Sequence, residues 1–227
     1  LFAPSHDTAS AVVACPMGEN DLYVSSGTWS LIGTETAEPI LTEKARKANF
    51  TNEGGVNFRF RFLKNYMGMW LFQNIRKNLN KSMTYDEMMS LAESTKSFSY
   101  VDVNDSSFVA PENMIEAVKA YLKMPEATLG YVLNSVYHSL AKSYKDAVDE
   151  IESITEKSFF AIHIVGGGCR DKYLNRLTAK YTGKKVTAGP IEATATGNII
   201  SQIIYDEKIT LEEARRIVIN SFDIKEI

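Results

Sequence analysis

The chain has 227 residues, of which 44% are hydrophobic and 23% charged, a composition typical of globular proteins. Its net charge of −3 argues against a nucleic-acid binder, because such proteins carry a basic surface. No apolar run reaches the roughly 20 residues that span a membrane, and no signal-peptide pattern is evident. Cys15 and Cys169 lie far apart without metal-type spacing, which favours a reducing, cytoplasmic location. Because the chain starts at Leu1, we expect it to be part of a longer protein.

The first third of the chain is expected to form a short helix, three strands and a second helix. Residues 6–15 have the pattern of a short helix, with Asp7 as its N-cap candidate. Two β-rich runs within residues 21–35 flank a turn at Ser26-Gly27-Thr28 and predict a hairpin. Residues 57–64 alternate polar and apolar side chains, which predicts a strand with one face in water. Helical spacing of apolar residues follows over 66–79.

The remainder is expected to be a helical insertion followed by alternating strands and helices. Two helices are predicted between residues 85 and 127, with Pro111 in the first turn of the second, and a long helix over 128–155. The apolar run 159–165 predicts a strand buried on both faces. Further elements are expected in chain order as a helix (172–181), a strand (185–188) and two helices (192–204 and 210–222). This order predicts one mixed α/β sheet covered by helices, as in an RNase-H-like or actin-like domain.

Two glycine-containing turns are the candidate ligand sites, because both fall at strand ends, where open α/β sheets bind ligands. Gly166-Gly167-Gly168 follow a buried strand and precede a helix, which suits a phosphate or nucleotide, but they match neither the P-loop nor the GxGxxG pattern. A tight strand-to-helix turn is the alternative. Ser25-Ser26-Gly27-Thr28 could likewise hold an oxyanion at a hairpin tip, or form a plain turn.

For each single polar candidate residue, a structural role is usually commoner than a functional one. Asp7 is expected to cap a helix on general grounds, and His163 to be a hydrogen-bonded core residue. His6 is ambiguous. Cys169 follows the glycines and could be a reactive thiol at a helix start, although a small buried residue is the commoner case.

Six segments carry a resemblance to a known family. In order they are SHDTASAVVA, YVSSGTWSLIGTE, TNEGG, LKNYMGMWL, HIVGGGCRDKYLN and AGPIEATATGN. Together they resemble the C-terminal half of the FGGY family of carbohydrate kinases. The resemblance covers nearly the whole chain and is weakest over residues 82–157. It implies that the chain, residues 1–227, is the nucleotide-binding second domain of a two-domain sugar kinase whose N-terminal domain lies outside it.

The resemblance also implies roles for particular residues. Asp7 would be the general base, and His6, Thr8 and Asn65 would contact the sugar together with Asp7. The nucleotide site would include Gly27, Thr28, Gln73, Gly167 and Gly168, with the glycines leaving bare backbone for the nucleotide. Aspartate is ordinarily ionised at pH 7 and can accept a proton from a hydroxyl group.

The reaction implied is ATP- and Mg²⁺-dependent phosphorylation of L-rhamnulose to L-rhamnulose 1-phosphate, in rhamnose catabolism. The chain by itself is expected to be inactive, because part of the cleft belongs to the other domain. Two alternatives stay open: a kinase for another ketose, and a non-catalytic actin-like ATP-binding module. Neither nucleic acid nor membrane is an expected partner.

Overall fold

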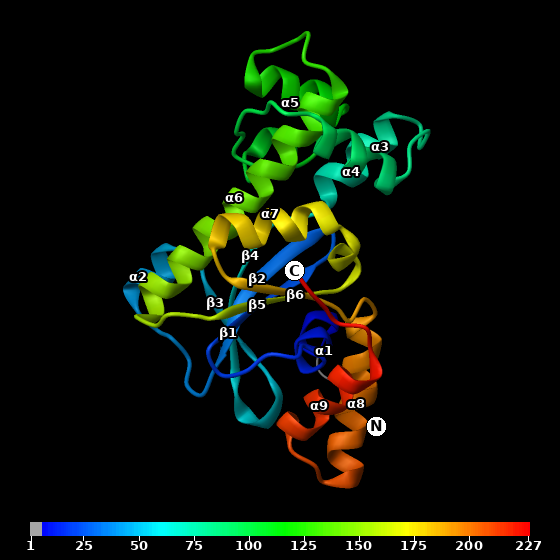
Figure 1. Ribbon diagram of the computed structural model, residues 1–227. Coiled ribbons are helices and arrows are strands. Elements are labelled where there is room, and N and C mark those ends of the chain that lie inside the picture. Colours follow the sequence, from blue (N-terminus) through cyan, green and yellow to red (C-terminus); the bar gives the residue numbers. More distant parts are fainter. Residues whose placement is uncertain (1–5) are drawn as a thin grey trace.

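A mixed sheet with helices on both faces forms the body of the protein in the computed structural model, which describes residues 6–227 (Figure 1). The strand order is β3-β4-β2-β1-β5-β6-β7. Strands β1, β5 and β6 are parallel to one another, and the other neighbouring pairs are antiparallel. The strands are β1 (Asp21–Ser26), β2 (Trp29–Thr36), β3 (Thr51–Gly54), β4 (Phe60–Met67), β5 (Ala161–Val165), β6 (Lys185–Ala188) and β7 (Lys225–Glu226). The predicted mixed α/β sheet is confirmed.

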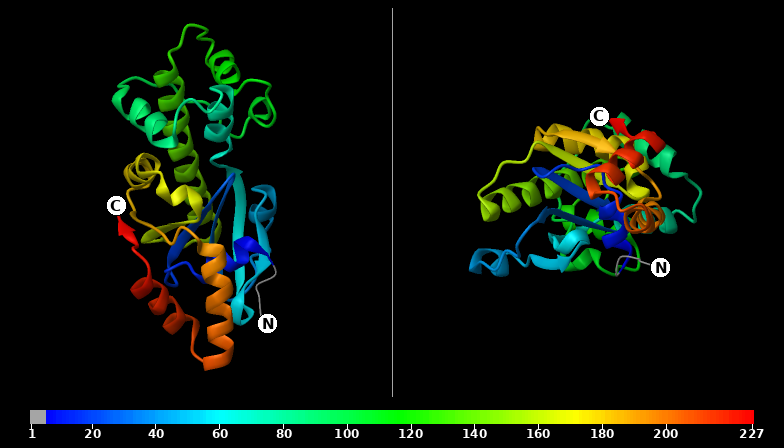
Figure 2. Two further views of the ribbon diagram at one scale, coloured as in Figure 1. Left: turned by 90° about the vertical axis from the view of Figure 1, so that its right-hand side faces the viewer. Right: turned by 90° about the horizontal axis from the view of Figure 1, so that it is seen from below.

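The helices divide between the two faces of the sheet and a separate lobe. They are α1 (Asp7–Val13), α2 (Glu43–Lys47), α3 (Trp70–Asn78), α4 (Tyr85–Ser94), α5 (Met114–Leu122), α6 (Leu129–Thr155), α7 (Lys172–Thr182), α8 (Ala193–Glu207) and α9 (Leu211–Ser221). Figure 2 shows α3, α4 and α5 with the first part of α6 as a helical lobe beyond one end of the sheet. No helix of residues 6–227 is long and apolar enough to cross a bilayer.

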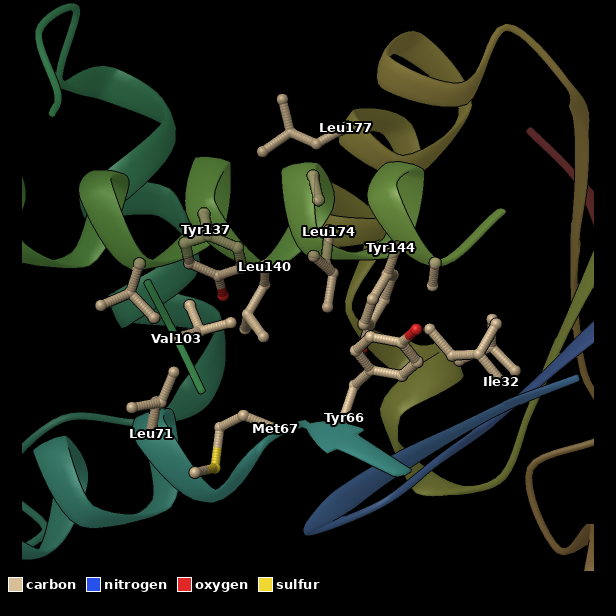
Figure 3. Packing of buried hydrophobic residues seen from close by; sticks show 14 of the residues in the cluster. Ile32, Tyr66, Met67, Leu71, Val103, Tyr137, Leu140, Tyr144, Leu174 and Leu177 are labelled. Atoms are coloured by element: carbon tan, nitrogen blue, oxygen red, sulfur yellow. The ribbon is translucent and has the colours of Figure 1, made fainter. Parts of the chain in front are cut away.

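Helix α6 joins the helical lobe to the sheet through one continuous apolar core. Tyr137 and Leu140 on α6 lie toward the lobe, near Leu71 of α3, whereas Tyr144, two turns along, lies against Tyr66 and the sheet (Figure 3). The Tyr144 hydroxyl is 2.5 Å from the Ser30 hydroxyl of β2. Fully burying a side chain of this size contributes about 1.5–3 kcal/mol, so α6 fixes the lobe relative to the sheet.

Helices α1, α8 and α9 cover the opposite face (Figure 1). Helix α8 approaches α1 closely because Gly197 has no side chain: a Cβ there would overlap the carbonyl of Ser10. The Ser10 hydroxyl donates to Asn198 Oδ1 over 3.3 Å. Thus the AGPIEATATGN segment packs against the SHDTAS segment, although nearly 190 residues separate them in sequence.

Several predicted boundaries were wrong, for local reasons. Strand β4 begins at Phe60, because Asn57 and Phe58 have positive φ and form the β3–β4 turn. Helix α3 begins at Trp70, since residues 66 and 67 complete β4. Helix α5 begins at Met114 behind an Asn113 cap, so Pro111 lies before the helix. Strands β3 and β7 and helix α2 are short, without apolar periodicity, and were not anticipated.

The predicted wet face of β4 was also wrong. Arg61 lies on that face, yet its side chain is only 1% exposed. Strand residues two apart point to the same side, and Leu63 of this face packs with Ala11 and Val12 of α1. The alternation of polar and apolar residues therefore indicated a strand correctly, but it could not show that α1 covers the polar side.

Candidate active site

A cavity of about 550 Å³ lies at the carboxyl ends of β1 and β5, facing α3 and α4 of the helical lobe. Open α/β sheets bind ligands at this edge. Four of the predicted nucleotide residues line it, namely Gly27, Gln73, Gly167 and Gly168, and the rest of the wall consists of Met69, Arg76, Thr84, Tyr85, Asp86, Met89, Arg170 and Asp171. The fold thus brings together four segments that are separated in sequence.

The turn between β1 and β2 holds the start of α3 against the cavity. The backbone N–H groups of Met69 and Trp70 donate to the carbonyls of Gly27 and Thr28, over 2.9 and 3.1 Å. These contacts satisfy amides that a helix N-terminus would leave without partners. They also place Gln73 one turn into α3, where its Oε1 accepts a 3.3 Å hydrogen bond from the Thr28 hydroxyl. Thr28 therefore adjoins the cavity through Gln73.

The Gly27 amide is not free, because it donates to the Trp29 carbonyl over 2.9 Å. Any phosphate contact at this turn would therefore involve the exposed Thr28 side chain more directly than the Gly27 N–H. The tip does form the predicted hairpin turn, with Ser26 of β1 opposite Ser30 of β2.

The three consecutive glycines have three different roles. Gly166 has φ +86°, a conformation that side chains rarely adopt, and a Cβ there would lie 2.9 Å from the Ser26 carbonyl. Gly168 is packed against Ser26: a Cβ would lie 2.8 Å from the Ser26 Cβ and closer still to its hydroxyl. Gly167 has no atom within 4 Å of its Cβ position and is exposed. Tight packing of the turn against β1 therefore explains Gly166 and Gly168, and only Gly167 leaves open space at the cavity.

Asp171 ends the glycine turn and begins α7. Its Oδ1 accepts the Leu174 amide over 3.0 Å as the N-cap, and its Oδ2 accepts the Tyr137 hydroxyl over 2.6 Å. Burial raises the pKa of this carboxyl above its usual value. Because Asp171 lines the cavity, the Tyr137 contact joins the cavity wall to α6.

The predicted sugar residues lie outside this cavity, on the sheet face covered by α1. Asp7 is the first residue of α1 and is exposed, and Thr8 follows in the same turn, partly buried. Asn65 of β4 is exposed and pairs with Leu31, which packs beneath α1. The predicted nucleotide residues and the predicted sugar residues therefore occupy neighbouring parts of the same domain.

The capping role expected for Asp7 was wrong. The N-cap of α1 is His6, and no side chain caps this helix. The Asp7 side chain forms no hydrogen bond or ion pair within residues 6–227, while its backbone carbonyl accepts the Thr194 hydroxyl of α8 over 3.2 Å. The carboxylate is therefore presented to solvent on a backbone that α8 holds in place.

Sequence reasoning missed two residues beside His6. Its Nε2 lies 3.1 Å from Glu53 Oε2 of β3 and 3.1 Å from Arg61 Nη2 of β4. The available signal was TNEGG, a conspicuous motif to which no role was assigned, and an arginine in the middle of a strand.

The remaining candidates have structural roles. His163 is buried, with Nδ1 2.7 Å from the Thr187 hydroxyl and Nε2 3.1 Å from Asp21 Oδ2, as expected for a hydrogen-bonded core histidine. Cys169 is buried, and burial raises its pKa to about 11, so it is not an activated thiol. Residues 6–227 contain no group of three or more His, Cys, Asp or Glu side chains arranged to hold a metal ion.

Comparison with known proteins identifies the family. The model of the FGGY family of carbohydrate kinases, C-terminal domain, matches residues 22–205. The chain belongs to the FGGY family of carbohydrate kinases.

Relatives of this FGGY domain include rhamnulokinases. Those of Halalkalibacterium halodurans and Oceanobacillus iheyensis are each 47% identical over 99% of this chain and 49% of their own length. The chain thus spans about half the length of these curated relatives. Among solved structures, a xylulose kinase from Lactobacillus acidophilus has the same fold, with a TM-score of 0.67 at 11% identity, over 97% of this chain and 44% of that one.

Proposed function

We propose that this chain is the C-terminal, nucleotide-binding half of a kinase that transfers phosphate from ATP to L-rhamnulose, giving L-rhamnulose 1-phosphate. The observation that carries the proposal is the 47% identity to rhamnulokinases along almost the whole chain. In addition, Gly27, Gln73, Gly167 and Gly168 line one cavity at the sheet edge. The other half of the enzyme would complete the cleft, since the relatives are about twice as long as this chain.

In the proposed reaction the nucleotide occupies the cavity between the sheet edge and α3–α4. Gly167 lets it lie against backbone, and Gln73 and Thr28 lie beside each other to contact it. Mg²⁺ would enter as MgATP, since this cation is usually held by phosphates together with one or two carboxylates. The chain's own contribution is to position the phosphates and exclude water.

Asp7 would act as the general base. Its carboxylate is exposed and has no partner within residues 6–227, so it is available to accept the proton of the attacking sugar hydroxyl. His6, Thr8 and Asn65 would contact the sugar from the same side of the sheet. A carboxylate engaged in capping would be less suited to this role, and Asp7 does not cap.

The test is ADP release by the full-length protein with a panel of ketoses. L-Rhamnulose should give the highest kcat/KM, with L-fuculose and D-xylulose well below it. A higher kcat/KM with another ketose would reassign the substrate within the kinase class. ATP binding without sugar-dependent ADP release would instead identify a non-catalytic ATP-binding module.

A further inference from the structure

A buried arginine and a glutamate hold the segment that carries Asp7, and no role has yet been given to either. We propose that Glu53 and Arg61 are positioning residues for the sugar site: they fix the His6 side chain and, through it, the first turn of α1. The inference rests on the proposed function, in which His6 and Asp7 face the sugar.

Glu53, Arg61 and His6 form a compact cluster at the start of α1. Arg61 Nη2 forms an ion pair with Glu53 Oε2 over 2.9 Å, and Arg61 Nε donates to the Gly54 carbonyl over 3.2 Å. Since His6 Nε2 is 3.1 Å from both partners, it can donate to the carboxylate in one tautomer and accept from the guanidinium in the other. The exposed fractions fall from 47% for the His6 side chain to 31% for Glu53 and 1% for Arg61. The cluster therefore runs from the exposed start of α1 into the interior.

The stability of the fold does not account for this pair. Arg61 Nη1 is buried and has no hydrogen-bond partner within residues 6–227. An unsatisfied buried donor is unfavourable, and replacing a buried ion pair with apolar residues of similar size is often neutral or stabilising. A positioning role fits this pair better. The pair contributes little to stability but directs His6, the only histidine beside Asp7 in the described segment.

Fixing His6 also fixes Asp7, because His6 begins α1. His6 is the N-cap, its backbone is extended, and its carbonyl accepts the Ser10 amide over 3.1 Å. Its side chain makes no capping bond and instead reaches Glu53 and Arg61. The first turn of α1 is thus held from both sides. On one side the Thr194 hydroxyl of α8 donates to the Asp7 carbonyl, and on the other Glu53 and Arg61 contact the His6 side chain. This gives the TNEGG segment a function.

The decisive variant is the double replacement Glu53→Met with Arg61→Met in the full-length protein. It removes both charges and leaves side chains of similar length, so the fold should keep its melting temperature. We expect kcat with L-rhamnulose to fall by about 10- to 100-fold and its KM to rise, because a misplacement of about 1 Å can reduce the rate about 100-fold. The KM for ATP should change less than about twofold, since the nucleotide cavity is on another part of the domain.

The matched control is Lys184→Met with Glu152→Met. This ion pair has a 2.7 Å contact between two mostly buried side chains, 14% and 28% exposed, but it joins the amino end of β6 to α6. It should leave both KM values and kcat near wild type. Should the first double variant unfold, Glu53→Asp supplies the second test, because it keeps the charge beside Arg61 but withdraws the carboxylate from His6. Glu53→Asp should reproduce the sugar-specific loss at near-normal melting temperature.

Hydrogen exchange of the peptide covering residues 6–13, measured by mass spectrometry, tests the positioning without turnover. Exchange should be faster in the double variant than in wild type and in the control. The proposal would be overturned by unchanged hydrogen exchange in the double variant, or by kcat and sugar KM values within twofold of wild type. It would also be overturned if the KM for ATP rose as much as the KM for the sugar. A wild-type protein that does not phosphorylate L-rhamnulose would refute the proposed function, and the exchange result would still decide whether the pair fixes α1.

Discussion

The glycine turn allows two neighbouring substitutions to separate nucleotide binding from folding. Gly167→Val adds a side chain where no atom lies within 4 Å, on the cavity side of the turn. Gly168→Ala adds a Cβ 2.8 Å from the Ser26 Cβ and still closer to the Ser26 hydroxyl, both on β1. We therefore expect Gly167→Val to fold normally and bind ADP weakly, and Gly168→Ala to be destabilised.

The magnitudes follow from these surroundings. A valine at Gly167 would occupy space assigned to the nucleotide, and we expect ADP affinity to fall at least about 10-fold, or about 1.4 kcal/mol. At Gly168 neither the turn nor β1 can move freely, so overpacking should lower the free energy of unfolding by about 1–3 kcal/mol. Adding Ser26→Ala to Gly168→Ala should restore part of that loss, because it removes the nearest atom.

Calorimetric titration with ADP and thermal unfolding of the full-length protein provide the two measurements. An ADP affinity unchanged by Gly167→Val in a folded protein would show that the nucleotide does not lie against this turn. A Gly168→Ala protein as stable as wild type would refute the packing argument. The two results are independent, because one depends on the ligand and the other on β1.

Three further outcomes can be tested on the same protein. Asp7→Asn should reduce kcat by about 10²–10⁴-fold, which corresponds to about 3–5 kcal/mol of transition-state stabilisation. The melting temperature should not change, because the Asp7 side chain caps nothing. A variant that retains more than about a tenth of the wild-type kcat would argue against Asp7 as the general base. Cys169 and Cys15 are buried with raised pKa values, so a thiol reagent at pH 8 should label them only on unfolding, and rapid labelling of the native protein would contradict this. The hydrogen bond from His163 lowers the pKa of Asp21 in the folded protein. Below about pH 4 the Asp21 carboxylate is protonated more readily in the unfolded chain than in the folded protein, so the free energy of unfolding should fall with pH. In urea unfolding, the Asp21→Asn variant should show a weaker acid dependence than wild type.

The position of the candidate ligand cavity agrees with local sequence rules. A buried apolar run ending in glycines predicts a strand and a turn, and ligands bind where parallel strands end. The structure accordingly places Gly27, Gly167 and Gly168 around one cavity. Gln73 was expected there only from the family resemblance, and its place depends on the Thr28 contact.

Predictions about individual side chains were less successful where distant segments decide the environment. Asp7 looked like a helix cap, but whether an aspartate caps a helix depends on backbone angles one residue away. Arg61 looked exposed, and no local pattern shows that α1 and α8 cover its face of the sheet. Glu53 lacked any apolar periodicity around it, so its strand and its partner were both overlooked.

The sequence by itself determined the order of the longer strands and helices, without β3, β7 and α2, together with the mixed sheet and the family. Periodicity, turn residues and motifs are local properties. Tertiary structure decided which glycine faces the cavity and which packs against Ser26, and it buried Arg61 beside His6. These outcomes depend on contacts between residues as far apart as Ser26 and Gly168. The environment of a side chain is set by whatever the fold brings against it, and that is fixed only when the distant segments have packed.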